Sequence, residues 1–275
     1  MRIGLALSGG GALGAAHIGV LEELDKHDIQ LNRLCGTSAG AIAGGLYASG
    51  GLPALHGFIA DLEKAGIINT IHGLLLRPMD VLFADIGRAL RKHIKEKDLR
   101  DFTLPFSCIA TDLVTGQMCT LTTGDPIAAI LASSAYPGVF PIQRINGRLL
   151  VDGGVTRNFP ADVLRHSSEL DFIIGSSIYM VPKMPPRQRG GKLSRLQTMI
   201  RSIDILVQES NNQQTALCDF SFIAPVEIYR QYDLEHVRNI CELGRIYAHE
   251  EIDRLVDTLQ QHGWENYDTA STQAA

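Results

Sequence analysis

Residues 36–40 read Gly-Thr-Ser-Ala-Gly, a G-x-S-x-G pattern that places Ser38 where an apolar strand gives way to an Ala/Gly-rich helix. A serine raised on such a sharp strand-to-helix turn is exposed for nucleophilic attack. The crowded turn favours neighbours without bulk, here Gly36 and Gly40. The pattern therefore indicates Ser38 as a candidate nucleophile. Taken alone, the same five residues also fit an ordinary tight turn.

A glycine-rich loop precedes this turn, at residues 9–14, and reads Gly-Gly-Gly-Ala-Leu-Gly. Its G-x-G-x-x-G spacing also occurs in dinucleotide-binding turns. However, the acidic residue expected after the next strand is replaced by residues 35–38, Cys-Gly-Thr-Ser, and no P-loop lysine follows. Bare N–H groups at the start of a helix suit an oxyanion hole better, with a ligand-free tight turn as the alternative. The glycines concerned are Gly9, Gly10 and Gly11, with Gly14 supporting the turn.

A nucleophilic serine requires a base, and the nine histidines offer no well-placed one. His17 lies one turn beyond the glycine loop, and surface or packing roles suit it and the others better. Asp152 is the better candidate, because an apolar strand ends in it. Gly153 and Gly154 follow, which leaves the approach to its carboxylate open. A simple Asp-Gly hairpin turn is the alternative.

The elements that must position these residues predict a parallel α/β sheet. A strand at 3–8, a helix at 15–27, a strand at 31–35 and a helix at 39–48 have the order of a crossover between parallel strands. Both special loops then leave carboxyl ends of strands, where ligand sites collect. Further strands are expected at 106–112, 118–122, 148–151, 172–176 and 220–224, and further helices at 125–133, 193–215 and 234–261.

The length and composition of the chain indicate its domain number, its partners and its compartment. A chain of 275 residues suits one large domain, and a net charge of -5 gives no global signal for nucleic-acid binding. Five cysteines without a C-x-x-C pair argue against a disulfide framework and a zinc site, so a reducing cytoplasm fits best. Glycines interrupt the apolar N-terminal run and residues 36–60, so we expect neither a signal peptide nor a membrane span.

Three segments bear on the substrate, each with two interpretations. Residues 81–97 form an amphipathic helix with basic side chains, either interfacial or packed on the sheet with a solvated basic face. Residues 66–83 fit an acyl groove or lid, or a part of the core. Residues 183–195 carry five basic side chains and no acid, as a loop facing lipid phosphates would, or as a plain exposed loop.

Four motifs follow one another along the chain. They are residues 9–14, residues 36–40, Ala-Ser-Ser-Ala-Tyr-Pro-Gly-Val-Phe-Pro at 132–141, and Asp-Gly-Gly at 152–154. Together they resemble the patatin-like phospholipase family, above all its small bacterial members related to neuropathy target esterase. The resemblance covers residues 5–165 as a catalytic core and leaves residues 166–275 to complete the same globular domain. It implies a three-layer αβα fold with a mainly parallel central sheet.

The resemblance implies a Ser38/Asp152 dyad without histidine, an oxyanion hole in the glycine loop, and no cofactor or metal. The reaction would be two-step hydrolysis of a phospholipid, a lysophospholipid or a simpler acyl ester, in the cytoplasm, with transient peripheral contact at the inner membrane face as an option. We expect burial to raise the pKa of Asp152, since an aspartate near its reference pKa is a weak base. One departure is Leu13, where such loops often carry Arg or Lys. It is the hint for the alternative, a non-catalytic or weakly active regulatory protein on the same fold.

Overall fold

The computed structural model describes residues 1–68, 78–167, 169–178 and 193–265. Within these residues, eight strands form one sheet in the order β5-β6-β3-β2-β1-β7-β8, with β4 paired to β3. The strands are β1 (Ile3–Leu7), β2 (Leu31–Thr37), β3 (Phe106–Asp112), β4 (Met118–Leu121), β5 (Gln143–Ile145), β6 (Arg148–Asp152), β7 (Phe172–Ser177) and β8 (Phe220–Ile223).

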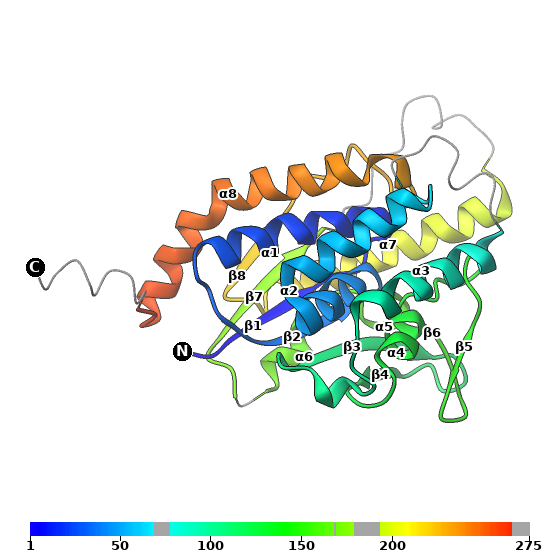
Figure 1. The fold of residues 1–275 in the computed structure, drawn as a ribbon, viewed down its shortest axis with the longest axis horizontal. Helices are drawn as coiled ribbons and strands as arrows, with labels where there is room; N and C mark the ends of the chain where they lie inside the picture. The colour runs from blue at the N-terminus through cyan, green and yellow to red at the C-terminus, as the bar shows by residue number, and fades with distance from the viewer. Residues whose placement is uncertain (69–77, 168, 179–192, 266–275) are drawn as a thin grey trace, which may run out of the picture.

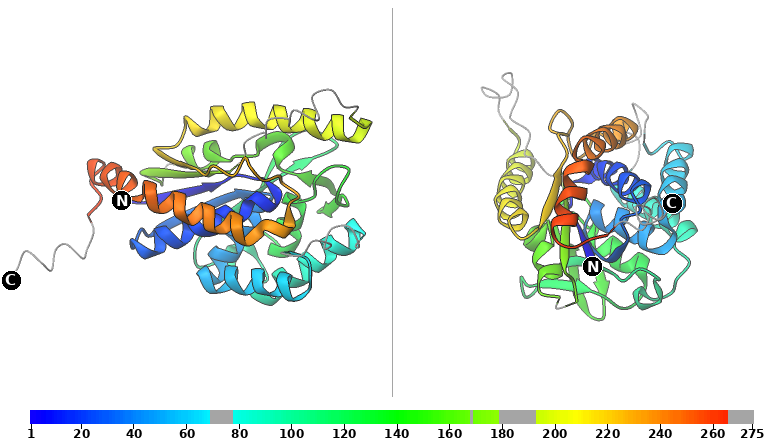
Figure 2. Two further views of the ribbon diagram at one scale, coloured as in Figure 1. Left: turned by 90° about the horizontal axis from the view of Figure 1, so that it is seen from above. Right: turned by 90° about the vertical axis from the view of Figure 1, so that its left-hand side faces the viewer.

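Helices cover both faces of the sheet, so the expected three-layer αβα architecture is confirmed. Helices α1, α2 and α8 lie on one face and α6 and α7 on the other (Figures 1 and 2). The helices are α1 (Ala16–Lys26), α2 (Ala39–Lys64), α3 (Met79–His93), α4 (Pro126–Ser133), α5 (Gly154–Arg157), α6 (Ala161–Arg165), α7 (Arg195–Thr215) and α8 (Val237–Gln261), with short 3-10 turns η1 (Gly11–Ala15), η2 (Leu99–Asp101) and η3 (Leu234–His236).

The centre of the sheet is parallel, as predicted. Strand β1 pairs in parallel with β2 on one side and β7 on the other, and β2 pairs in parallel with β3. All five residues of β1 are buried, as expected of a strand covered by helices on both faces. The loops after β1 and β2 therefore emerge side by side at the carboxyl edge of the sheet.

The β3 end of the sheet is antiparallel, which the sequence analysis did not predict. Strand β6 runs antiparallel to β3, and the unpredicted β5 pairs antiparallel with β6. Asn146 and Gly147 join β5 to β6 with φ values of 49° and 79°. An Asn-Gly pair readily adopts two such positive φ angles in a tight hairpin turn. The hairpin turn of this region is therefore formed by Asn146-Gly147. Asp152-Gly153, for which a hairpin turn was the alternative interpretation, instead joins β6 to α5.

Helix α2 is longer than predicted and is bent. The expected helix at 39–48 continues to Lys64, through non-helical backbone angles at Gly50 and Gly51. Pro53 lies two residues after Gly51, where a helix restarting after a break tolerates its missing N–H. The bend lets the two halves of α2 contribute side chains to one cavity, described below.

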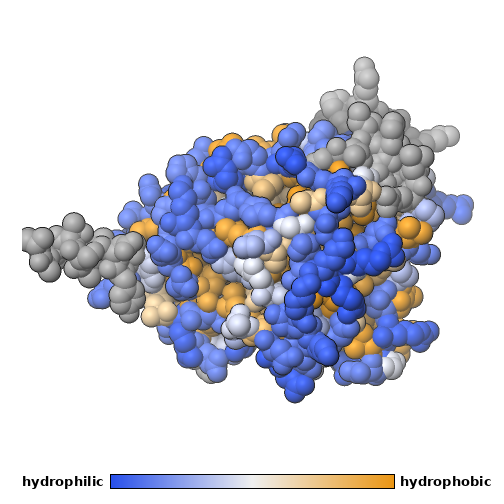
Figure 3. Space-filling model, viewed as in Figure 1, coloured by the Kyte–Doolittle hydropathy of each residue, from blue (hydrophilic) through white to orange (hydrophobic). Residues whose placement is uncertain are grey.

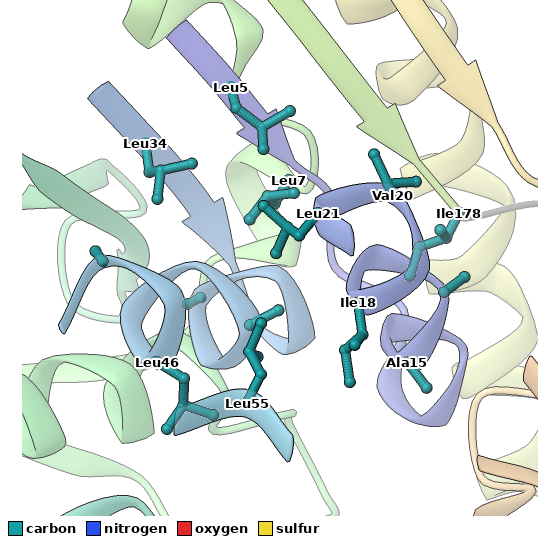
Figure 4. Packing of buried hydrophobic residues seen from close by; sticks show 14 of the residues in the cluster. Leu5, Leu7, Ala15, Ile18, Val20, Leu21, Leu34, Leu46, Leu55 and Ile178 are labelled. Atoms are coloured by element: carbon teal, nitrogen blue, oxygen red, sulfur yellow. The ribbon is translucent and has the colours of Figure 1, made fainter. Parts of the chain in front are cut away.

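Close helix packing supports the N-terminal unit. A Cβ atom at Gly19 of α1 would lie 2.2 Å from the backbone nitrogen of Arg245 in α8, and one at Gly244 would lie 2.3 Å from the carbonyl oxygen of Ala16. The two helices therefore meet backbone to backbone. Figure 4 shows side chains of α1 and α2, including Leu21 and Leu46, packed with those of β1 and β2 in the main core.

The segment predicted as an amphipathic helix at 81–97 forms α3, which ends at His93 and packs on α2 and α4 rather than on the sheet. Leu82 and Leu90 are buried, and the helix packs against α2. Its basic side chains are exposed and form ion pairs, such as Arg91 with Asp125 and Lys92 with Asp61. Figure 3 shows the mixed surface of one face of the molecule, where apolar patches lie between polar side chains.

Candidate active site

Ser38 lies in a sharp turn between β2 and α2. Its backbone angles are φ 54° and ψ -119°, a region that costs a non-glycine residue about 1–3 kcal/mol. A Cβ at Gly36 would lie 2.3 Å from the carbonyl oxygen of Gly40, and one at Gly40 would lie 2.4 Å from that of Leu7. Glycine is therefore required on both sides of the turn. This backbone has the strained geometry of a nucleophile elbow.

Asp152 reaches the same place from the antiparallel part of the sheet. Register places Thr37 of β2 opposite Ile109 of β3, and Asp152 of β6 opposite the next residue of β3, Ala110. A Cβ at Gly153 would lie 2.2 Å from the carbonyl oxygen of Ile109, so a bare glycine lets this segment cross β3 closely. The sequence predicts Asp152 at the shared edge, and the antiparallel register of β6, rather than a parallel strand end, places it there.

The carboxyl group of Asp152 is buried and faces Ser38. Oδ1 accepts a hydrogen bond from the N–H of Gly154 at 2.7 Å. Oδ2 is buried and meets no donor of hydrogen-bond geometry within the described residues, although the Ser38 side chain lies close enough to lower the pKa of the carboxyl. Burial outweighs these hydrogen bonds and raises the pKa of Asp152 from 3.8 to about 6. The expected direction of this pKa shift is confirmed.

The glycine loop lies beside Ser38, with one correction to its expected role. The N–H of Gly9 donates to the carbonyl oxygen of Asn158 at 2.9 Å, so this donor is not available to an oxyanion. Gly10 and Gly11 line the cavity next to Ser38, and for their N–H groups no acceptor appears in the described part of the chain. Gly14 packs on the helix that follows Ser38, because a Cβ there would lie 2.4 Å from that of Ala39.

Several supporting residues were not predicted. Ser133, at the end of α4, accepts a hydrogen bond from the N–H of Ser38 at 3.0 Å. Asn158 contacts the glycine loop, and His17, judged a surface or packing residue, is fully buried beneath that loop. The only sequence signal for Ser133 is its place in the motif at 132–141. Neither Asn158 nor His17 has a spacing that predicts its contacts.

Ser38 and Asp152 line an apolar cavity of about 290 Å³. Both halves of the bent helix α2 line it, with Ile42 before the bend and Phe58 after it, as do residues of α3 and the loop at 134–140. Of the predicted groove at 66–83, Ile68 and residues of α3 contribute to the lining, and residues 69–77 lie outside the described part. An apolar cavity that contains a polar pair suits a substrate with a hydrocarbon chain.

Leu13, the departure from the expected motif, is buried in the main core. It does not line the cavity. A basic residue with the same orientation would place a charge in that core, which is costly. In this chain, Leu13 therefore contributes to the packing of the core.

Two features are absent from the residues that the structure describes. No helix among them is both long and apolar enough to cross a membrane. The same residues contain no group of three or more His, Cys, Asp or Glu side chains able to hold a metal ion. Of the basic loop at 183–195, residues 183–192 lie outside the described part.

The known proteins to which the chain is similar include patatin-like and NTE family proteins. The chain is 26% identical over 287 residues to a patatin-like phospholipase domain-containing protein of Caenorhabditis elegans, covering 92% of this chain and 21% of that protein. It is 33% identical over 159 residues to an uncharacterised NTE family protein of Mycobacterium tuberculosis, covering 58% of this chain and 44% of that protein. The chain thus spans less than half the length of either relative.

A lysophospholipase NTE1 of Cryptococcus neoformans is 31% identical over 206 residues, covering 70% of this chain and 12% of that protein. Among solved structures, VipD from Legionella pneumophila matches with a TM-score of 0.50 and 14% identity, covering 92% of this chain and 67% of that one. This likeness concerns the fold. The sequence profile of the Patatin-like phospholipase family matches residues 5–165. The chain therefore belongs to the patatin-like phospholipase family.

Proposed function

We propose that the chain is a serine hydrolase of lipid acyl esters that uses a Ser38/Asp152 dyad. The observation that carries this proposal is the pairing itself: a strained, partly buried serine turn faces a buried carboxyl, and both residues line one apolar cavity. The family membership supports the same class of reaction. Among the described residues, no histidine lines this cavity. Asp152 is therefore the residue that we assign as the base for Ser38.

In the first half-reaction, Oδ2 of Asp152 takes the proton of the Ser38 hydroxyl as Oγ attacks the ester carbonyl carbon. The N–H groups of Gly10 and Gly11 stabilise the negative charge that develops on the carbonyl oxygen. The tetrahedral intermediate collapses to an acyl-enzyme. The leaving alcohol takes the proton back from Asp152.

In the second half-reaction, Asp152 takes a proton from water, which attacks the acyl carbon. Collapse of this intermediate releases the fatty acid and returns the proton to Ser38 Oγ. A pKa of about 6 suits Asp152 for this role, since at neutral pH it is ionised yet binds a proton more readily than a solvated aspartate. The acyl chain lies in the apolar cavity, and the cavity lining favours chains with many methylene groups.

The test is labelling by a serine-directed fluorophosphonate, combined with hydrolysis of p-nitrophenyl esters and lysophospholipids. We expect the wild type to be labelled at Ser38 and to release fatty acid. Ser38→Ala should lose both activities, and Asp152→Asn should lose most of its turnover. A wild-type protein that is neither labelled nor active on any ester would refute the proposal.

A further inference from the structure

Two peptide units meet at Gly9, and together they have two C=O groups and two N–H groups. Three of these four groups have a hydrogen-bond partner. The Ser8 carbonyl oxygen lies 2.8 Å from Nε2 of His17, and the N–H of Gly9 donates to the Asn158 carbonyl at 2.9 Å. In the next unit, Nδ2 of Asn158 donates to the Gly9 carbonyl oxygen at 3.4 Å. Only the N–H of Gly10 has no acceptor in the described part of the chain.

His17 is fixed in one tautomer by its two contacts. Because the Ser8 carbonyl only accepts, Nε2 carries the proton, and Nδ1 accepts from the Ser176 hydroxyl at 2.8 Å. The ring is fully buried, and burial lowers the pKa of His17 to about 4. His17 therefore stays neutral at physiological pH and acts as a constant single donor to the loop.

Asn158 is held from behind by a second buried amide. Its Nδ2 also donates to Oδ1 of Asn211 in α7 at 3.3 Å, and both side chains are almost fully buried. A Cβ at Gly9 would lie 2.3 Å from Oδ1 of Asn158, so only glycine allows this close approach. The amide therefore contacts the loop directly.

We propose that His17 and Asn158 are positioning residues that direct the Gly10 N–H into the cavity. The N–H and C=O of a trans peptide point in opposite directions, and this chain has no cis peptide within its described residues. Holding the Gly9 carbonyl on Asn158 thus turns the Gly10 N–H away from it. The inference rests on the proposed function, because the directed N–H is the one assigned to the oxyanion.

The kinetic test compares Asn158→Leu and His17→Leu with the wild type on one ester. Misdirecting an oxyanion donor should lower kcat by roughly 10–1000-fold, because that donor acts chiefly in the transition state, and should change KM by no more than about 3-fold. His17→Gln should recover most of kcat, since its amide places a donor near the position of Nε2. Asn212→Leu, an exposed neighbour on α7, is the matched control and should behave as wild type.

Amide hydrogen exchange at Gly9 tests the geometry without any substrate. We expect this N–H to exchange at least about tenfold faster in Asn158→Leu and His17→Leu, because its peptide unit is no longer held. Wild-type exchange in both variants, or wild-type kcat in both, would overturn the inference. A wild type without esterase activity would instead refute the proposed function, and the exchange result would still decide whether the two residues hold the loop. Should one variant fail to fold, the other carries both measurements.

Discussion

The hydroxyl of Ser133 accepts a hydrogen bond from the main-chain N–H of Ser38 at 3.0 Å. The carbonyl oxygen of Ser133 also accepts from the N–H of Gly153 at 3.3 Å. A single residue at the end of α4 thus joins the serine turn to the segment that carries Asp152. The relative position of the two proposed catalytic residues depends on this junction.

Replacing Ser133 should destabilise the protein, and its neighbour provides a matched control. Ser133→Ala leaves the Ser38 N–H without an acceptor, which should lower the free energy of unfolding by about 1–3 kcal/mol. Ser134 is also buried, but its hydroxyl has no partner in the described part of the chain, so Ser134→Ala should be neutral or stabilising. Urea denaturation of both variants measures the difference, and equal losses would contradict the assigned role of the Ser133 hydroxyl.

The strain at Ser38 predicts that function and stability oppose each other at this residue. Glycine adopts positive φ without steric cost, so Ser38→Gly should be more stable than Ser38→Ala by about 1 kcal/mol. Both variants should be inactive. Thermal unfolding compares them, and an alanine variant as stable as the glycine variant would show that the turn is unstrained.

The raised pKa of Asp152 predicts the pH dependence of catalysis. If the carboxylate is the base, kcat/KM should fall about tenfold per pH unit below pH 6 and level off above it. A pH-rate profile for a soluble ester measures this. A profile with no ionisation between about pH 4.5 and 7 would count against Asp152 as the base.

The same shift predicts a stability change of defined sign. Since folding raises the pKa of Asp152 from 3.8 to about 6, the folded state binds this proton more tightly than the unfolded state. The resulting stabilisation is complete below pH 3.8 and is lost as the pH rises through 6. Asp152→Asn should therefore be more stable than the wild type at pH 8 by about 1–3 kcal/mol. This gain in stability should shrink toward pH 4, and urea titrations of both proteins at several pH values measure it. A difference in stability that does not change with pH would contradict the shift in the pKa of Asp152.

The cavity predicts which substitution alters chain-length preference. Ile42 lies one helical turn after Ser38 and lines the cavity. Ile42→Phe should obstruct a long acyl chain and lower kcat/KM for p-nitrophenyl palmitate by roughly 10-fold or more, a loss typical of a misfit in an apolar pocket. The value for p-nitrophenyl butyrate should change little and serves as the internal control. An equal loss on both esters would place the acyl chain elsewhere.

Much of the fold was predictable because the strands of the parallel centre are continuous apolar runs. The predicted strand at 106–112 coincides with β3, and the Asp125 cap and Pro126 mark the start of α4. The antiparallel pairing of β6 with β3 was not predicted, because the apolar residues of a short strand do not reveal which way it runs beside its neighbour. The predicted helix at 39–48 was too short, since Gly50 and Gly51 indicate an end where the structure bends and continues.

The candidate site was predictable where chemistry and spacing coincide in a short segment. Ser38 and the glycine loop follow strands directly, and Asp152 was identified by its place after an apolar run. His17 was not identified because its contact with Ser8, nine residues away, depends on how the loop folds back over α1. Ser133 and Asn158 were not identified, because their contacts are with segments far away in the sequence. The assignment of Gly9 as an oxyanion donor failed for the same reason, since its N–H partner is Asn158.

The N-terminal strand and helix pack against elements that are synthesised much later. The strand that leads into the glycine loop, β1, lies between β2 and β7, and α1 packs on Gly244 of α8. Both β7 and α8 follow residue 165, where the family profile ends. A nascent chain that stops at that point holds every catalytic motif yet lacks the neighbours that hold its first strand and helix. We therefore expect a chain truncated at residue 165 to leave β1 and α1 incompletely packed, so that the glycine loop and Ser38 lose the support they have in the whole fold.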